Sequence, residues 1–326
     1  MGAPLEIRAW RPGDAPVPEA FPPASLVGRP LLAPLDERVW RWAFAANPAG
    51  TRLFLAWRDG RVVARYGALP VRTRVPGPQG AAEARTFACL LGGWTGEGEE
   101  TLRATAEAFL AAHGGPEGDL VHYGWPDAPE LAFGQAYLGH ELLRTGSLFV
   151  RALGSGPTEL PGPVRAVERF GPEADELYAC CATHWNASAI RDAAFLNWRF
   201  LDAPARRYRV LAFQSGATLR GYAVVGGGAE LDPRLALLVD WLVLPGDDEA
   251  SAALLAGALA TARATGAAAL ATALPEWSPW AQHFQAQGFR HHATPHLATL
   301  RASVPRFDML WLRDAWWNTL ADALAL

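Results

Sequence analysis

The sequence has 326 residues, more than one hydrophobic core usually organises, so two domains are expected. Half of the residues are apolar and 19% are charged, as in ordinary globular proteins. The formal net charge is −4, whereas proteins that bind nucleic acid through its phosphates are basic, so nucleic acid is excluded as the main ligand.

The chain opens with "MGAPLEIRAWRPGD", which has neither the basic head nor the apolar core of an export signal. The most apolar runs, "RLALLVDWLVLP" and "SAALLAGALATARATG", are interrupted by Asp240 and Arg263. Neither run reaches the roughly 18 apolar residues that a membrane-spanning helix needs. We therefore expect a cytoplasmic protein with no membrane partner.

The first predicted element is a β-hairpin, in which the apolar runs "RLFLAW" and "VVARYGALPV" flank the turn "RDGR". A similar stretch returns in the second half of the chain, where "YRVLAF" and "LRGYAVV" flank "QSGA". The two stretches align without a gap, so that Trp42 matches Trp198 and Tyr66 matches Tyr222. The sequence therefore contains two copies of one hairpin.

Each hairpin is followed by a strand, a turn and a helix, the pattern of an α/β unit. The first copy has the strand "TFACLLGG" and a helix over residues 99–112, and the second has "LALLVDWLVLP" and a helix over 248–265. Each copy then ends in a strand, a helix and a returning strand, with Gly139 or Gly288 ending the helix. A repeat of this length indicates a duplicated domain, because solenoid repeats span only about 20–50 residues.

The repeats divide the chain into four expected segments. These are an N-terminal α/β domain over residues 1–152, a linker rich in Gly and Pro over 153–163, a C-terminal α/β domain over 164–302 and an extension over 303–326. Each domain is expected to be a twisted mixed β-sheet flanked by helices, in the α/β (α+β) class.

The extension belongs to neither copy. Its apolar residues Trp316, Trp317, Leu320 and Leu324 recur at helical spacing, which predicts a short helix docked on one of the domains. Packing in a core is the expected role of its tryptophans.

Taken together, the opening "LEIRAWRPGD", the hairpin, the strand leading through a glycine loop into a helix, and the endings "LGH" and "QGF" resemble the GNAT superfamily of acyl-CoA-dependent N-acyltransferases, as a tandem pair. The likeness covers residues 4–302. It implies acetyl-CoA or another acyl-CoA as co-substrate, no metal, and a small-molecule amine as acceptor. In that superfamily a glycine loop and the following helix N-terminus hold the pyrophosphate of coenzyme A.

The resemblance places the coenzyme-binding residues in the first copy, at Leu91, Gly92, Gly93, Trp94, Thr95, Gly96, Glu97 and Gly98. Both motif glycines, Gly96 and Gly98, are present, although Gly93 stands where the superfamily has Arg or Gln. In the second copy Ala250 replaces the first motif glycine and Asp247 fills the Arg position. Only the first loop is therefore expected to bind coenzyme A.

Acidic residues crowd this loop, at Glu97, Glu99 and Glu100. Carboxylates in a first helical turn stabilise the helix through its dipole, but a carboxylate turned toward a phosphate repels it. The direction of these side chains decides between the two effects, and both possibilities stay open at this point.

The superfamily often uses a Tyr four residues before the helix-ending glycine as general acid, but those positions hold Gln135 and Phe284. Other catalytic candidates are His122 and Tyr123 on the strand "LVHYGWP", one of which should face the cleft because side chains alternate along a strand. Asp240, a charge within an apolar strand, is a candidate base if burial raises its pKa. Hydrogen bonding at a domain interface is the alternative role for Asp240.

The stretch "HHATPH" brings His291, His292 and His296 together in sequence. Neighbouring residues on a strand point to opposite faces, and no Cys or carboxylate lies at ligand spacing, so no metal site is expected.

The leading hypothesis is a probable N-acyltransferase whose first domain holds the acyl-CoA, with the second domain as a degenerate copy. The alternative is a catalytically degenerate protein of the same fold that binds a ligand or a protein partner. A third possibility, transfer of amino acids from tRNA, is disfavoured by the weak negative charge.

Overall fold

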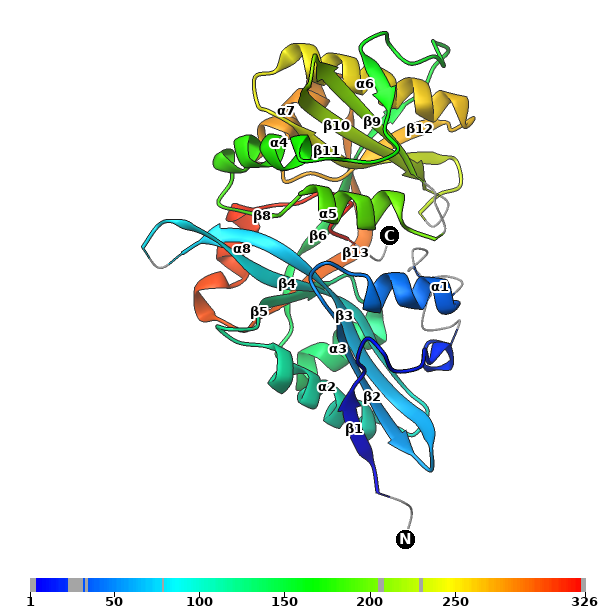
Figure 1. Cartoon of the computed structure of the whole chain (residues 1–326), viewed down its shortest axis with the longest axis vertical. Coiled ribbons are helices and arrows are strands. Elements are labelled where there is room, and N and C mark those ends of the chain that lie inside the picture. Colours follow the sequence, from blue (N-terminus) through cyan, green and yellow to red (C-terminus); the bar gives the residue numbers. More distant parts are fainter. Residues whose placement is uncertain are drawn as a thin grey trace.

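The structure is a computed structural model that describes residues 4–22, 32, 35–77, 79–204, 208–228 and 231–323. Two lobes lie along the long axis of the molecule (Figure 1). The N-terminus lies at the far end of the lobe formed by the first half of the chain, and the C-terminus lies between the lobes. The two copies recognised in the sequence thus occupy different ends of the molecule.

The first lobe contains a hairpin, an α/β unit and a final strand, in the predicted order. Its elements are β1 (Glu6–Ala9), the 3₁₀ turn η1 (Pro18–Ala20), α1 (Glu37–Trp40), the π-helical turn η4 (Arg41–Ala45), β2 (Arg52–Arg58), β3 (Arg61–Pro76), β4 (Ala82–Thr95), α2 (Glu99–His113), β5 (Asp119–Gly124), α3 (Ala128–Tyr137) and β6 (Glu141–Ala152). The helix predicted over 99–112 is therefore confirmed as α2. This helix packs on the sheet through Thr105 and Phe109, which share one face at helical spacing.

The second lobe repeats this order. Its elements are β7 (Val164–Ala166), α4 (Glu173–Cys181), the 3₁₀ turn η5 (Ala182–His184), β8 (Ala187–Ala189), α5 (Ala193–Leu196), the π-helical turn η6 (Asn197–Leu201), β9 (Tyr208–Ser215), β10 (Thr218–Gly227), β11 (Leu235–Val243), α6 (Asp248–Ala264), β12 (Ala269–Thr272), α7 (Pro279–Ala286) and β13 (Arg290–Ala302). Both predicted hairpins are antiparallel pairs, β2–β3 and β9–β10. None of the helices in the described residues is long and apolar enough to cross a membrane.

The final strands are exchanged between the copies. β13, the last strand of the second copy, pairs with β5 of the first, and β6, the last strand of the first copy, pairs with β12 of the second. β6 and β13 also pair with each other, so one continuous sheet runs through both lobes in the order β1-β2-β3-β4-β5-β13-β6-β12-β11-β10-β9-β7. The returning strands were predicted, but their exchange was not. Because strand pairing continues from one copy into the other, it marks no domain boundary. The domain boundaries at residues 152 and 164 therefore stay a prediction.

The two matched tryptophans meet at the seam between the lobes. The Trp42 and Trp198 rings are stacked with centroids 5.0 Å apart. The indole N–H of Trp42 donates to the Trp198 carbonyl at 2.7 Å, and that of Trp198 donates to the Trp42 carbonyl at 2.9 Å. Such a reciprocal contact is what a two-fold relation between the copies produces.

The extension departs from its predicted helix. It forms the 3₁₀ turn η7 (Pro305–Phe307), α8 (Met309–Ala315) and β14 (Trp316–Trp317), so the helix ends before the tryptophans. β14 pairs in parallel with β8, and the Trp317 ring stacks on Trp185 at 4.1 Å. Pairing with the edge of β8 and stacking on Trp185 therefore decide the conformation of Trp316 and Trp317, in place of the helix that their spacing predicted. Trp316 and Trp317 are buried, which confirms their packing role, while Leu324 lies outside the described residues.

Candidate active site

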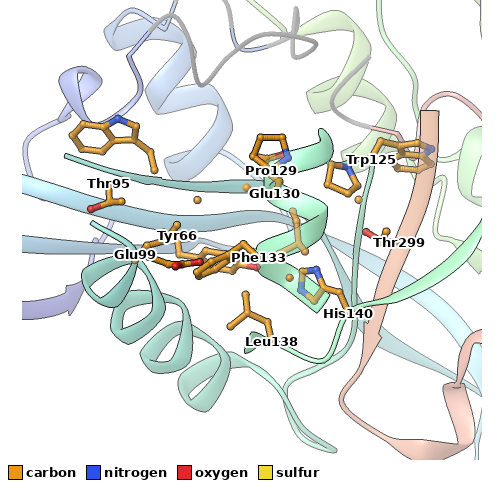
Figure 2. Close-up of a pocket in the computed structure, with 18 residues that line it drawn as sticks. Tyr66, Thr95, Glu99, Trp125, Pro129, Glu130, Phe133, Leu138, His140 and Thr299 are labelled. Atoms are coloured by element: carbon orange, nitrogen blue, oxygen red, sulfur yellow. The ribbon is translucent and has the colours of Figure 1, made fainter. Parts of the chain in front are cut away.

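A cleft opens in the first lobe where the ladder between β4 and β5 ends. The last paired residues are Cys89 and Tyr123, whereas β4 continues to Thr95. The cleft has a volume of about 420 Å³, and its apolar walls are formed by Leu90, Trp94, Leu102, Trp125, Phe133 and Leu138. Thr95 and Glu99 lie toward one end, and His140, Trp125 and Thr299 lie toward the other (Figure 2). The glycine loop thus borders one end of an apolar cleft.

A β-bulge shapes the wall formed by β4. Tyr66 on β3 pairs with Gly93 while Ala68 pairs with Leu90, so Leu91 and Gly92 together oppose one residue of β3. Gly92 has a φ of 73°, in the left-handed region that glycine adopts without strain. The buried Arg65 guanidinium fixes this geometry by donating to the Gly92 carbonyl at 2.7 Å.

Two amides of the glycine loop already have acceptors within the protein. The Gly96 amide donates to the Val63 carbonyl at 2.9 Å, and the Glu97 amide donates to the Thr95 hydroxyl at 3.1 Å. α2 then begins after Gly98, which has a φ of 114° and supplies no side-chain cap. The first-turn amides of α2 therefore lack the side-chain acceptor that usually covers a helix N-terminus, which makes this end suitable for an anion.

The acidic residues of the loop point in different directions. The Glu97 carboxylate pairs with Arg58 at 3.3 Å, which neutralises it. Glu99 lines the cleft and is exposed, as is Glu100. An exposed carboxylate is screened by water and is free to swing into solvent, so its repulsion of a bound anion is weak compared with that of a buried one.

The corresponding helix end in the second lobe is closed by its own side chains. Asp247 caps α6 by accepting from the Ala250 amide at 3.0 Å, and Arg220 donates to Asp247 at 2.6 Å and to Glu249 at 2.7 Å. Burial acts to raise the pKa of Asp247, but the hydrogen bonds from Arg220 and Ala250 outweigh it and lower that pKa. A carboxylate therefore occupies the N-terminus of α6, whereas the N-terminus of α2 has no side-chain cap.

Aromatic rings fill the space between β11 and α7 in the second lobe. The buried Trp241 ring contacts the rings of Trp280 and Phe284 at centroid distances of 5.6 and 5.2 Å. α3 stands in the equivalent place in the first lobe and lines the open cleft with Pro129 and Phe133. The two copies thus differ at both the loop and the cleft.

The structure places His122 and Tyr123 on opposite faces of β5, and neither is among the residues that line the cleft. His122 is fully buried under α2, with its ring 5.5 Å from Phe109 and its Nε2 3.4 Å from the Asp119 carboxylate. Burial lowers the pKa of His122, although Asp119 opposes that effect. On the other face, the Tyr123 hydroxyl donates to the Asp322 carbonyl at 3.0 Å.

Asp240 is also remote from the cleft. It is fully buried on β11, where it accepts hydrogen bonds from the Tyr222 hydroxyl at 2.8 Å and the Thr319 hydroxyl at 2.7 Å. Arg191 lies 3.4 Å away and also pairs with Asp322 of the extension. The network joins the second copy to the extension, whereas the alternative considered for Asp240 was hydrogen bonding at a domain interface.

The histidines of "HHATPH" are spread along β13, and His291 pairs with Glu276 at 3.0 Å. Within the described residues, no three His, Cys, Asp or Glu side chains come together as metal ligands would.

His140 lines the cleft and was missed by the sequence arguments, as were the titratable residues Tyr66 and Glu130. His140 follows the helix-ending Gly139, and its ring lies against Gly134 of α3, where an added Cβ would stand 2.3 Å from Nδ1. Its buried Nε2 has no hydrogen-bond partner among the described residues. Burial, with repulsion from His122 and Arg301, lowers the pKa of His140 to about 4. The sequence signal for His140 was its place in "LGH", directly after the helix-ending glycine. The absence of a side chain at Gly134 is what leaves room for the His140 ring.

The comparisons with known proteins support the fold. No protein-family model matches the sequence, and no curated protein matches it. Among solved structures, a probable N-acyltransferase from Enterococcus faecalis V583 is 13% identical with a TM-score of 0.60, covering 92% of this chain and 73% of that one.

Two further structures show a similar arrangement. N-myristoyltransferase from Saccharomyces cerevisiae, solved with bound myristoyl-CoA, is 10% identical with a TM-score of 0.53, covering 92% of this chain and 83% of that one. A tandem GNAT protein from the clavulanic acid biosynthesis pathway is 16% identical with a TM-score of 0.50, covering 93% of this chain and 99% of that one. The chain therefore has the GNAT fold, present twice in tandem.

Proposed function

We propose that the first lobe binds an acyl-CoA in its cleft and transfers the acyl group to an amine, while the second lobe has lost this capacity. The observation that carries the proposal is the contrast between the two helix ends. The first turn of α2 has no side-chain cap and borders an open cleft, whereas α6 is capped by Asp247 and bridged by Arg220. An uncapped helix N-terminus favours a diphosphate, and apolar walls suit a pantetheine arm and an acyl chain.

The solved N-myristoyltransferase, which shares the fold and was solved with an acyl-CoA bound, is consistent with this type of co-substrate. When bound, the acyl-CoA supplies a thioester whose carbonyl carbon an amine attacks. A carbon–nitrogen bond forms, the carbon–sulfur bond breaks, and one proton moves from nitrogen to the sulfur.

We assign the transfer of that proton to His140, which lines the cleft. Its Nε2 is unpaired among the described residues, and the low pKa of its ring keeps it neutral at physiological pH, so it is able to accept. Its protonated form, with a pKa of about 4, is a stronger acid than a thiol. It would therefore pass the proton to a thiolate, because a thiol has a pKa near 8.5. His140 would act as a shuttle in place of the tyrosine that Gln135 replaces.

Calorimetric titration of the full chain with acetyl-CoA tests the binding step. The wild type should bind, and Gly96→Glu should weaken binding at least roughly tenfold because it adds a carboxylate beside the phosphate-binding amides. Position 96 has room for the change, since an added Cβ meets nothing closer than 3.7 Å. Gly162→Glu makes the same substitution in the linker, where a Cβ meets nothing, and should bind like the wild type. No binding by the wild type at millimolar acetyl-CoA would reject the proposal.

A second candidate function is binding without turnover. It is favoured by Gln135, which stands where the superfamily often has a catalytic tyrosine. Release of free thiol from acetyl-CoA in the presence of a panel of amines separates the two functions. Thiol release that His140→Ala abolishes supports transfer, whereas tight acetyl-CoA binding with no thiol release across the panel supports the binding protein.

A further inference from the structure

A second, smaller cavity of about 50 Å³ adjoins the cleft. Trp125 lines both cavities and, among the described residues, is the one residue that they share. It lies at the His140 end of the cleft, away from the glycine loop (Figure 2). The small cavity therefore lies next to the end of the cleft where the proposed acyl transfer takes place.

The exchanged strands create this cavity. The pairing of β13 with β6 is interrupted between Ala293 and Leu297, and Thr294 and His296 line the cavity at that interruption. Gly146 on β6 permits the close approach, because an added Cβ would lie 2.8 Å from the Thr294 hydroxyl. The cavity is thus formed by both copies and the extension together.

Arg144 gives the cavity a positive charge, which the Glu276 carboxylate offsets only through space. The Arg144 Nη2 donates to the Asn318 side-chain carbonyl at 2.8 Å, and no described residue forms an ion pair with Arg144. Elsewhere Arg191 pairs with Asp240 and Asp322, and Arg52 pairs with Asp119, whereas the fully buried Arg199 donates to the Ala321 carbonyl and the Tyr208 hydroxyl. What distinguishes Arg144 is that its half-buried guanidinium lines a cavity, where donors not used by Asn318 are available to an anion.

We propose that this cavity recognises the acyl acceptor and that Arg144 binds a carboxylate of that molecule. The inference rests on the proposed function and narrows its substrate class to amines that carry a carboxylate, such as amino acids. A planar carboxylate matches the fork of a guanidinium, and Ser147 adds a hydroxyl donor to the same cavity. A molecule that reaches past Trp125 presents its amine to the cleft while its carboxylate stays on Arg144. The cavity volume of about 50 Å³ has room for a carboxylate group, since one water molecule needs roughly 10–15 Å³.

The test compares charged and neutral forms of the same molecule. Ligand-observed NMR is recorded on the full chain with a panel of N-acetyl amino acids and the matching N-acetyl amino amides, which differ in the carboxylate alone. The wild type should bind at least one acid roughly tenfold more tightly than its amide. Arg144→Gln keeps a donor for Asn318 and should abolish that preference, whereas Arg144→Lys keeps the charge and should retain part of it.

Arg151→Gln is the matched control, because Arg151 lies on the same strand but lines neither cavity. It should bind the acids as the wild type does. Equal binding of acid and amide in every pair, or an undiminished preference in Arg144→Gln, would overturn the inference. Acetyl-CoA affinity, measured separately, should be unchanged by Arg144→Gln. Acid preference without acetyl-CoA binding would keep the carboxylate site and reject the acyltransferase.

Discussion

The His140 imidazole is held neutral by its surroundings, and this makes stability depend on pH. Burial lowers its pKa to about 4 in the folded chain, whereas an unfolded histidine titrates near 6.5. Between about pH 6.5 and about pH 4, His140 is therefore protonated in the unfolded chain and neutral in the folded chain. The contribution of His140 to the free energy of unfolding is therefore complete above about pH 6.5. It decreases as the pH falls toward 4, by up to about 3 kcal/mol.

His140→Gln removes this titration, so the variant should lose less stability than the wild type between about pH 7 and about pH 4.5. Urea unfolding at several pH values measures the difference. His113, whose pKa is also lowered by burial, is present in both proteins. Parallel loss of stability in the two proteins would show that the His140 ring is solvated in the folded chain.

Gly134 is the residue that makes room for this ring. In a helix interior, Gly→Ala usually stabilises by about 1 kcal/mol. Here the new Cβ would stand 2.3 Å from His140 Nδ1, so Gly134→Ala should instead destabilise by roughly 1–3 kcal/mol through overpacking. In a His140→Ala background the same change should be neutral or stabilising. A double-mutant cycle in urea measures the coupling, and additive effects would contradict the contact.

Residue-level reasoning from the sequence predicted a binding loop that borders the cleft but did not point to His140. Side-chain alternation places His122 and Tyr123 on opposite faces, yet every residue of β5 is buried. α2 covers one face and the extension covers the other, and neither arrangement is visible in a local pattern. His140 follows the end of α3, where the direction of a side chain depends on the geometry of the turn and not on a helical or strand period. Local periodicity therefore locates strands, whereas the cleft depends on what covers them.

The N-terminus of α6 shows how an element can lose a ligand site and gain stability. Asp247 accepts from the Ala250 amide and from Arg220, so it satisfies groups that a bound anion would otherwise satisfy. Asp247→Ala should lower the free energy of unfolding by about 1–2 kcal/mol, the usual contribution of an N-cap. Asp248→Ala deletes the neighbouring exposed carboxylate and should change stability by less than about 0.5 kcal/mol. Urea denaturation compares the two, and equal effects would contradict the capping role.

Hairpins and helices were predictable because their determinants are local. Gly139 and Gly288 have φ values of 68° and 84°, in the left-handed region that ends a helix, and the helix predicted over 248–265 is α6. The exchange of β6 and β13 was not predictable in this way. Both copies end in similar strands, so the apolar pattern of each fits either partner and leaves the choice to the whole fold.

The extension joins three parts of the molecule. Asp322 binds Arg191 of the second copy through its carboxylate, and its backbone carbonyl accepts from Tyr123 of the first copy. Arg144 on the exchanged strand β6 donates to Asn318. Contacts of this kind, between residues far apart in sequence, bind the lobes into one unit and position both sides of the small cavity.

The exchanged strands make the two halves interdependent. Residues 1–152 alone would leave one edge of β5 without β13, and β6 without β13 and β12. Unpaired edges of this kind are prone to association, because their amides and carbonyls remain available to other chains. Residues 1–152 expressed alone should therefore fail to give a monomer that unfolds cooperatively. Co-expression with residues 153–326 should restore one sheet, seen as a stoichiometric complex in size-exclusion chromatography. A stable, monomeric 1–152 fragment would show that each copy completes its own sheet in solution.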